Sequence, residues 1–319
     1  RGVEDALGGG PDKRPALLAE SIAGDTSVGP ALAYAQAVEA LAGCDVPARA
    51  QVIRAIALEV ERVANHVGDL GALGSDIGFL PTSAWFGRLR GEFLNLLAEM
   101  SGSRYGRGLI RPGGVLFDLP EHLAREAARR LTRAREELRE VAGLFFETSS
   151  VRSRLEGVGT LTRQACDELA LLGPVARACG ASRDVRRDHP PGRGSTAPIP
   201  VASAATGDVL ARAQVRWIET QRSLEFVIEQ FRSLPAGTIR EACGPPAPGR
   251  LAVSMVEGWR GEIVHVVLTG EGRCFSRYKV KDPSFQNWSG LALALRGMQI
   301  SDFPLCNKSF NLSYAGHDL

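Results

Sequence analysis

The chain has 319 residues, 44% of them hydrophobic, and its 38 lysines and arginines almost balance 36 acidic side chains. Such a chain can bury a large core, and neither a disordered protein nor a basic nucleic-acid-binding domain has this composition. No apolar run approaches the roughly 20 residues that span a bilayer, so the sequence predicts no membrane helix.

The six cysteines form no pattern that predicts a metal site or a disulfide framework. None stands in a C-x-x-C pair, and no histidine follows at ligand spacing. We therefore expect thiols, mostly buried, in a reducing cytoplasm. The positions are Cys44, Cys166, Cys179, Cys243, Cys274 and Cys306.

Helical periodicity governs the chain after its glycine-rich start. Residues 1–19 are interpreted as a loop or the start of a fragment. A first helix is expected over 30–43, and a longer one over 47–78, where apolar side chains recur at three and four residues. This stripe consists of Val52, Ile56, Val60, Val63, Val67 and Leu70.

Two further long helices frame an irregular segment. One helix opens at the Thr82 cap and ends at Gly102, and another runs over 120–148 with Glu and Arg at helical spacing. Residues 103–115 between them contain too much glycine and arginine for a helix, so we expect an irregular loop there.

The next part of the chain predicts a linker, a helix and three strands. Residues 188–205, rich in proline and small side chains, predict a linker, and an amphipathic helix follows over 207–234. The period then changes to two over 251–256, 262–268 and 274–280, which is typical of antiparallel strands.

The predicted fold class is α+β and mainly α: a bundle of long helices with a small antiparallel β-sheet near the C-terminus. A short helix over 285–296 is expected after the last strand. We expect one domain over 20–319, with a helical core over about 30–235 and a β-rich part over about 250–319.

The densest polar block of the second helix lies at residues 61–71. At about 100° per residue, Glu59 and His66 fall at the edge of the apolar stripe, whereas Asp69 and Asp76 point toward a neighbouring surface. A buried Glu and His two turns apart can relay protons, because burial raises a carboxylate pKa toward the working range. A structural His satisfied by a neighbouring helix is the alternative that the sequence leaves open.

Two other segments are rich in arginine. Arg104, Arg107 and Arg111 stand beside flexible glycines, which suits a carboxylate partner or a reduced cofactor held by an adjoining protein. An ordinary solvated loop is the alternative. In residues 173–190, Asp and Arg side chains can pair and attach a long loop to the core. No nucleophile–base pair, phosphate-binding loop or dinucleotide fingerprint accompanies these segments.

Five sequence blocks occur in an order that resembles a known superfamily: residues 32–39, 61–71, 104–115, 173–187 and 282–285. They are similar to the [NiFe]-hydrogenase large subunits, in the branch shared by membrane-bound group 4 hydrogenases and the D (49-kDa) subunit of complex I. The resemblance covers about residues 20–319. The segment 302–310 looks most like hydrogenase-III large-subunit-like proteins of complex-I-related assemblies.

Members of that superfamily bind a binuclear metal through an early R-x-C-G-x-C-x-x-x-H loop and a C-x-x-C tail. Laid on this pattern, Ala23, Thr26 and Pro30 replace the Cys, Cys and His of the loop, and Ser313 and Gly316 replace the tail cysteines. Methyl and hydroxyl groups cannot substitute for the thiolate ligands of soft metals. The resemblance therefore implies that this chain holds no metal and is not an active hydrogenase.

In complex I the vacated cavity receives a quinone head group, beside the small subunit that carries the terminal iron–sulfur cluster. By resemblance, residues 23–30 and the start of the third helix line the equivalent cavity here. Pro30 and Phe86 fall where complex I has a histidine and a tyrosine, and neither can donate a hydrogen bond to a quinone carbonyl. Gly106 replaces a histidine near the cluster, although two arginines of residues 104–115 keep their places.

The resemblance implies a metal-free subunit of a membrane-associated, complex-I-like oxidoreductase that is inactive alone. Such a subunit would bound a quinone-type cavity beside an iron–sulfur small subunit and couple electron transfer to ion translocation. It would bind no cofactor except a quinone, with NADH or ferredoxin as a donor through other subunits. Membrane-arm subunits would hold it on the cytoplasmic side of the inner membrane. The alternative is a non-catalytic scaffold or coupling subunit that binds no redox substrate.

Overall fold

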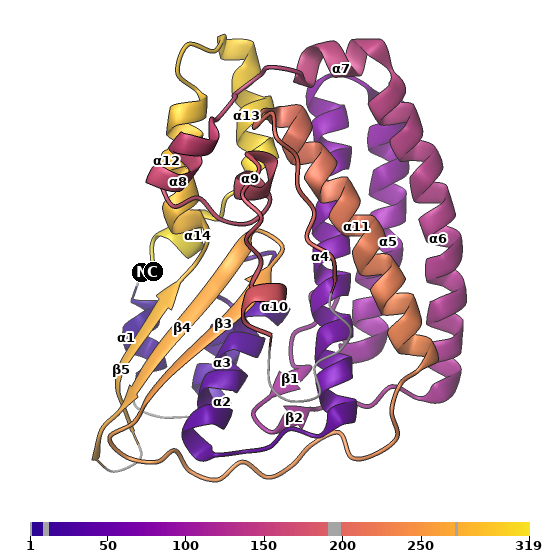
Figure 1. Ribbon diagram of the computed structural model, residues 1–319. Helices are drawn as coiled ribbons and strands as arrows, with labels where there is room; N and C mark the ends of the chain where they lie inside the picture. Colours follow the sequence, from indigo (N-terminus) through magenta and orange to yellow (C-terminus); the bar gives the residue numbers. More distant parts are fainter. Residues whose placement is uncertain (1, 9–12, 191–198, 272–273) are drawn as a thin grey trace.

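The computed structural model describes residues 2–8, 13–190, 199–271 and 274–319 (Figure 1). It has a bundle of long helices on one side and a small antiparallel sheet, backed by a helix, on the other. This arrangement confirms the predicted mainly α fold with a small sheet. The bundle consists of α4 (Ala48–Asp76), α5 (Leu80–Ser101), α6 (Glu121–Glu147) and α11 (Val209–Arg232).

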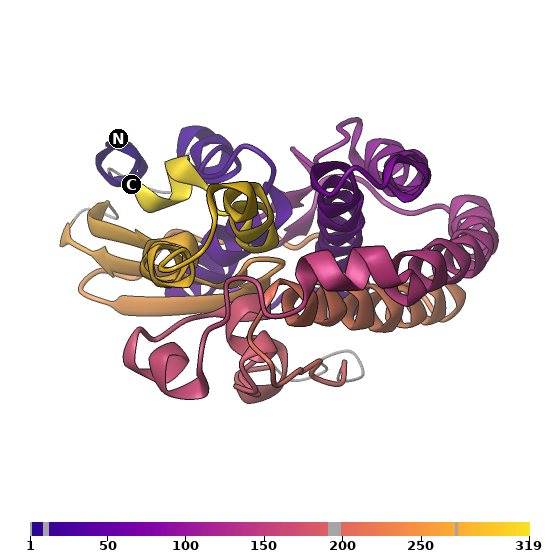
Figure 2. The same ribbon diagram turned by 90° about the horizontal axis from the view of Figure 1, so that it is seen from above.

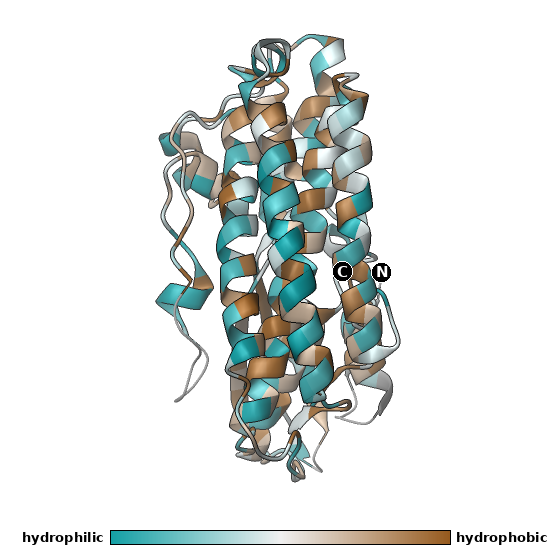
Figure 3. Cartoon of the chain, turned by 90° about the vertical axis from the view of Figure 1, so that its right-hand side faces the viewer, coloured by the Kyte–Doolittle hydropathy of each residue, from teal (hydrophilic) through white to brown (hydrophobic). Residues whose placement is uncertain are grey.

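The bundle forms because each long helix buries an apolar stripe. The stripe predicted on α4 is buried along its whole length. Helices α4 and α5 approach closely at two glycines: a Cβ on Gly71 would lie 3.1 Å from the Cβ of Phe86, and one on Gly74 would lie 3.1 Å from the Thr82 hydroxyl. Figure 3, which views the molecule from the bundle side, shows hydrophilic and hydrophobic residues interleaved along helices, as expected for amphipathic helices.

The sheet has the strand order β3-β4-β5, all antiparallel, and occupies nearly the residues predicted. Strands β3 and β4 are joined by a two-residue turn, Trp259 and Arg260, because Gly258 pairs with Gly261. One face packs on α3, where the rings of Tyr34 and Tyr278 stack at 6.3 Å. The elements of this layer are α3 (Val28–Ala42), β3 (Leu251–Gly258), β4 (Gly261–Thr269) and β5 (Phe275–Lys281).

The interpretation of residues 1–19 as a loop was wrong for the described part. Helices α1 (Val3–Leu7) and α2 (Lys13–Ala19) form there, and they bury Leu7 and Ala19 in a small core with α3 and the sheet. Helices this short have too few turns to show a period in sequence, and their stability comes from tertiary packing. Residues 9–12 lie outside the described residues.

The C-terminal part is less β-rich than expected, because strands end at Lys281 and helices follow. These are α12 (Ser284–Ala294), η2 (Ile300–Asp302), α13 (Phe303–Phe310) and α14 (Tyr314–His317). The loop predicted over 103–115 contains a short ladder of β1 (Ile110–Arg111) and β2 (Gly114–Val115).

Short helices connect α6 to α11. They are α7 (Ser149–Leu155), α8 (Arg163–Glu168), α9 (Gly173–Ala178) and α10 (Val185–Asp188). Of the linker predicted over 188–205, residues 191–198 lie outside the described residues. Seen from above, α8 and α9 lie on the side of the sheet away from α3 (Figure 2).

Candidate functional site

Charged side chains from α4, α9, α10, α11 and β3 meet between the bundle and the sheet. We call them the ion cluster: Glu59, Arg62, His66, Arg177, Asp184, Arg186, Glu219 and Glu257. Arg177 lies at its centre, because its guanidinium donates to both Glu219 and Glu257 at 2.8 Å. The side chains of all three are 2% exposed or less. The local pairing predicted within 173–190 occurs between Arg186 and Asp184 at 2.6 Å.

Electrostatics keep two carboxylates of the ion cluster, those of Glu59 and Glu219, ionised. Burial alone would raise the pKa of Glu219, but Arg177 and the hydrogen bond to His66 outweigh it and hold the pKa well below its usual value. Burial likewise opposes the ionisation of Glu59, and Arg62 and Arg186 reverse the effect and lower its pKa. Both carboxylates are therefore anionic inside the protein.

His66 is neutral in this setting, since burial lowers its pKa to about 4. Its Nε2 lies 2.8 Å from Glu219, an anion that can only accept, so Nε2 carries the proton. Its Nδ1 then accepts from Arg216 at 3.2 Å. The sequence left open that His66 is a structural residue bonded to a neighbouring helix, and its contact with Glu219 of α11 is of this kind.

Glu59 and His66 are connected through other charges. Arg62 joins Glu59 to Glu219, the partner of His66: its Nε donates to Glu59 at 3.0 Å, and its Nη1 lies 3.5 Å from Glu219. Proton relay by Glu59 and His66 stays a prediction. Asp69, which the helical period pointed toward a neighbouring surface, accepts from Asn311 at 2.7 Å.

Sequence reasoning missed the α11 side of this cluster. Arg212, Arg216 and Glu219 are all buried, with Ser223 donating to Glu59 at 2.6 Å. Their spacing of four, three and four residues places them on one helix face. That spacing was the available signal, but the sequence alone does not show that this polar face is turned inward.

A second polar region joins the early loop to the C-terminal tail. Arg260, from the β3–β4 turn, donates to both carboxylate oxygens of Asp25 at 2.7 Å and to the backbone oxygen of Asn311. The Trp259 indole donates to the Thr26 hydroxyl at 2.9 Å, and the Arg260 guanidinium lies 3.9 Å from the Trp259 ring. We call these five residues the loop–tail junction.

Glu61 holds the backbone next to this junction. Its carboxylate accepts from the amides of Ser27, Val28 and Gly29 at 2.7, 2.8 and 3.2 Å. Burial raises the pKa of Glu61 to about 7, even though these three donors favour the anion. Glu61 stood in the polar block of the second helix, but neither Glu61 nor Arg260 was singled out from the sequence.

The structure brings most of the predicted cavity residues to the two segments of this junction. Ala23 and Thr26 pair across a tight turn, and Pro30 is buried in the first turn of α3. In the tail, the Ser313 hydroxyl accepts from the Gly316 amide at 2.9 Å.

Phe86 lies elsewhere, in the bundle. It is fully buried, with its ring 6.1 Å from that of Phe145 and its Cβ packed toward Gly71. The contacts described for Phe86 are therefore with the bundle and not with the early loop or the tail. Its place in a cavity stays a prediction.

The arginine loop lies against the early loop. Arg111 donates to Glu20 at 2.7 Å, and Arg107 donates to the Ser27 hydroxyl at 3.3 Å, while Arg104 is exposed. Gly106 packs so tightly on Val28 that an added Cβ would lie 2.6 Å from a methyl group. Residues 20–30 are thus flanked by the arginine loop on one side and the tail on the other.

By the resemblance, Ala23, Thr26, Ser313 and Gly316 stand at the four cysteine positions of the superfamily. They offer no thiolate, so these residues do not fit a nickel centre. A side chain at 316 would also place its Cβ 2.5 Å from the carboxyl carbon of Asp282. Within the described residues, no group of His, Cys, Asp and Glu could hold a metal ion.

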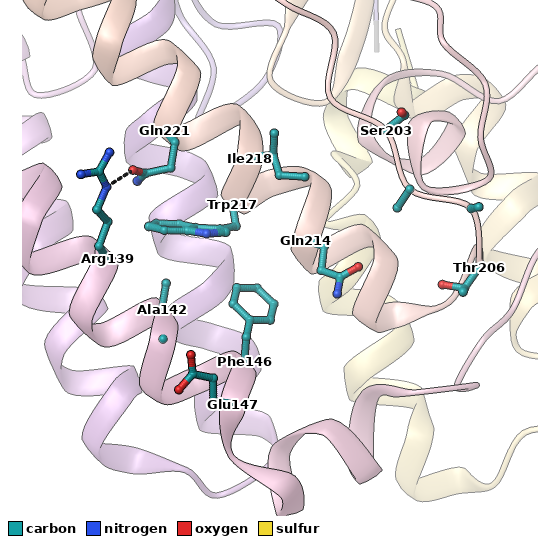
Figure 4. Close-up of a pocket in the computed structure, with 13 residues that line it drawn as sticks. Arg139, Ala142, Phe146, Glu147, Ser203, Thr206, Gln214, Trp217, Ile218 and Gln221 are labelled. Atoms are coloured by element: carbon teal, nitrogen blue, oxygen red, sulfur yellow. Dashed lines mark hydrogen bonds between the residues drawn. The ribbon is translucent and has the colours of Figure 1, made fainter.

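A separate groove of about 810 Å³ lies between α6, α11 and residues 203–206 (Figure 4). Phe146 and Trp217 line it, and Arg139 donates to Gln221 at its edge. None of the residues predicted from the sequence as a functional site lines this groove.

Comparisons with known proteins place the chain in context. The family model described as "Respiratory-chain NADH dehydrogenase, 49 Kd subunit" matches residues 76–246 and 242–318. Formate hydrogenlyase subunit 5 of Escherichia coli is 31% identical over 302 residues, which cover 95% of this chain and 53% of that protein. The chain thus spans about half the length of this relative.

Two other relatives are similar over most of their length. NADH-quinone oxidoreductase subunit 4 of Thermus thermophilus is 32% identical over 298 residues, 85% of this chain and 73% of that protein. In the structure of the membrane-bound sulfane sulfur reductase, an archaeal respiratory membrane complex, one chain matches with a TM-score of 0.92 and 26% identity. The match covers 100% of this chain and 88% of that chain.

These relatives are subunits of membrane-bound, complex-I-like hydrogenase or oxidoreductase complexes. Among the described residues, no helix is both long and apolar enough to cross a membrane. The matched segments cover well over half of the sequence, and the structural match extends over all of it. The chain belongs to the family of the 49 kDa subunit of the respiratory-chain NADH dehydrogenase.

Proposed function

We propose that this chain is the metal-free, hydrogenase-like subunit of a membrane-associated, complex-I-like oxidoreductase. In this proposal residues 23–30 form part of a quinone-type cavity beside a partner iron–sulfur subunit, and their movement couples electron transfer to ion translocation. The observation that carries the proposal is that this loop bonds the arginine loop through Ser27 and is linked to the tail through Arg260.

The residues on either side of the loop suit a redox substrate whose charge changes. Arg104 is exposed, and Arg107 reaches the Ser27 hydroxyl, so guanidinium donors stand beside the loop. Donors of this kind stabilise oxygen atoms that gain negative charge on reduction. Glu61, with a pKa of about 7, is the nearby acid whose protonation such a charge would change.

Electrons would come from a cluster in the partner subunit, with NADH or ferredoxin as the donor through other subunits. Membrane-arm subunits would hold the chain on the cytoplasmic side of the inner membrane. The chain itself supplies position and charge, and it is inactive alone.

The competing proposal is a scaffold or coupling subunit that binds no redox substrate. Pro30 and Phe86 lack hydrogen-bond donors on their side chains, and Thr26 already bonds Trp259, Arg260 and Asp25. These observations favour the scaffold, whereas the arginine loop favours the redox cavity.

The deciding experiment uses the chain purified within its assembly. Metal content and extracted quinone are measured by mass spectrometry. The rates at which the assembly reduces a short-chain quinone and polysulfide are then measured. Bound quinone without nickel supports the quinone-type cavity. The absence of both quinone and nickel supports the scaffold. Stoichiometric nickel overturns both proposals. If the assembly reduces polysulfide but not quinone, the substrate of the cavity is sulfane sulfur and the quinone proposal is wrong.

A variant pair sharpens this experiment. R104A/R107A removes the two donors beside the loop and should lower the kcat/KM for quinone by roughly tenfold or more, because each lost charge-assisted bond costs about 1.5–3 kcal/mol. The control R129A removes an exposed arginine of α6 and should leave the activity unchanged. Equal effects of the two variants would count against the cavity.

A further inference from the structure

In the described part of the chain, the outer face of the sheet, away from α3, is buried at one end and exposed at the other. Side chains alternate along a strand, so Leu251, Val253, Met255 and Glu257 share this face. Glu257 is buried there by Arg177 of α9 and by the backbone amide of Val185 of α10. Among the described residues, Leu251 and Val253 are exposed and Met255 is half-buried, so this end of the face is open in the described part of the chain.

The uncovered end is apolar on two neighbouring strands. In the β3–β4 register, the three cross-strand pairs on this face all join apolar residues: Leu251 with Leu268, Val253 with Val266, and Met255 with Val264. Leu251 is 65% exposed, Val253 56% and Leu268 41%. An antiparallel sheet with one solvated face normally presents polar side chains there. We call these six residues the apolar stripe.

The size of the apolar stripe matches one helix. From Leu251 to Met255 the strand advances roughly 14 Å at about 3.4 Å per residue. This distance equals roughly two and a half helical turns of about 5.4 Å each, and two strands with their side chains span about the 10 Å diameter of a helix. A helix on the open face of a sheet is the usual way to bury such a surface.

Positive charge lies along one side of the stripe. On β5, Arg277 is opposite Leu268 and Lys279 is opposite Val266 in the register, and both are exposed. Lys279 contacts Glu4, whereas no described carboxylate pairs with Arg277. At the end of the stripe near Met255, Lys281 and Glu262 form an ion pair at 3.3 Å, so their charges cancel there.

We propose that an amphipathic helix of a partner subunit docks on the apolar stripe, with its apolar side on β3 and β4 and carboxylates directed toward Arg277 and Lys279. This surface is distinct from the loop–tail junction, because the stripe lies toward the opposite end of the β3–β4 hairpin from the turn that carries Arg260. The inference therefore does not depend on quinone binding.

The experiment places a photo-crosslinking amino acid at Val253 in the assembled complex, with Leu144 of α6 as a matched control, since it is also an exposed apolar residue at 44%. Crosslinked peptides are sequenced. We expect the Val253 probe to capture one helical segment with apolar residues at three- and four-residue spacing and Asp or Glu beside them. A second copy of this chain, a segment without carboxylates or no crosslink would overturn the proposal.

Substitutions test the two halves of the interface. V253E should reduce the amount of that partner in the purified assembly by roughly tenfold. R277E should reduce the amount by a smaller factor, and its effect should be larger at low salt than at high salt. L144E is the control and should leave the composition unchanged. Val253 is exposed, so the fold should persist, and retention of the remaining subunits checks this. An unchanged partner content in V253E would contradict the docking site.

Discussion

The ion cluster, which is mostly buried, and the loop–tail junction, which is partly buried, both contact α4, but they differ in how many side chains hold each one. In the ion cluster, Glu219 has three partners: Arg177, His66 and Arg62. At the junction, one guanidinium links Asp25 to the tail, and one carboxylate, that of Glu61, holds the next three amides.

From this difference we expect the ion cluster to be more rigid than residues 20–30. When one partner is removed, Glu219 of the ion cluster keeps two others, whereas Arg260 is the one described side chain that bonds both the Asp25 carboxylate and the tail. A change of one proton or one side chain can therefore alter residues 20–30 while the ion cluster stays intact. The following predictions test this contrast.

The largest effect is expected at the centre of the ion cluster. R177M removes the cation shared by Glu219 and Glu257 and should lower the free energy of unfolding by about 3–5 kcal/mol, because two buried carboxylates each lose a cationic partner. Chemical denaturation of the assembled protein measures it. The control R183M removes an exposed pair with Asp167 and should cost less than about 1 kcal/mol. Similar losses of unfolding free energy for both variants would show that the ion cluster contributes little to stability.

Glu61 should give the junction a pH dependence near neutrality. Its pKa of about 7 in the folded state lies above the ordinary 4.5, so the folded protein holds a proton that the unfolded chain releases between these pH values. The stabilisation is complete below about pH 4.5 and is lost as pH rises through about 7. The difference in unfolding free energy between wild type and E61Q should therefore fall by about 3 kcal/mol over this range.

The control for Glu61 is E140Q, which changes an exposed carboxylate of α6. Its difference from wild type should be flat across the same pH range. A flat difference for E61Q as well would mean that Glu61 is ionised throughout, with the three backbone donors outweighing burial.

Much of the fold could be predicted because its signal is local. The apolar side chains of α4 and the alternation of β3 and β4 are properties of single segments, and these elements formed close to the predicted bounds. The junction could not be predicted in this way. Arg260 stands in a two-residue turn, where an exposed arginine is the usual expectation, and its partner Asp25 lies 235 residues earlier. No periodicity links such distant positions, so only tertiary structure reveals the pair.

A smaller effect is expected at Gly316, which by the resemblance stands at a cysteine position of the superfamily's tail. In G316A the added Cβ would lie 2.5 Å from the carboxyl carbon of Asp282, which should cost about 1–3 kcal/mol through overpacking. The control G87A, on α5, has nothing within 4 Å and should be neutral or stabilising by up to about 1 kcal/mol. Thermal unfolding measures both. If G316A were as stable as G87A, Asp282 would not be what excludes a side chain at 316.

The smallest effect on stability is expected at Arg260, and hydrogen exchange should show which segment of the chain it loosens. R260K keeps the charge beside Asp25 but loses the planar fork that bonds both carboxylate oxygens and Asn311, a cost of about 1.5 kcal/mol. Hydrogen exchange should rise roughly tenfold in peptides covering residues 20–30 and stay unchanged in α11, because the ion cluster has its own partners. An equal rise in α11 would mean that the two regions open together. No rise in residues 20–30 would assign the loop to Glu61 alone, and the coupling step of the proposed function would then depend on the protonation of that one carboxylate.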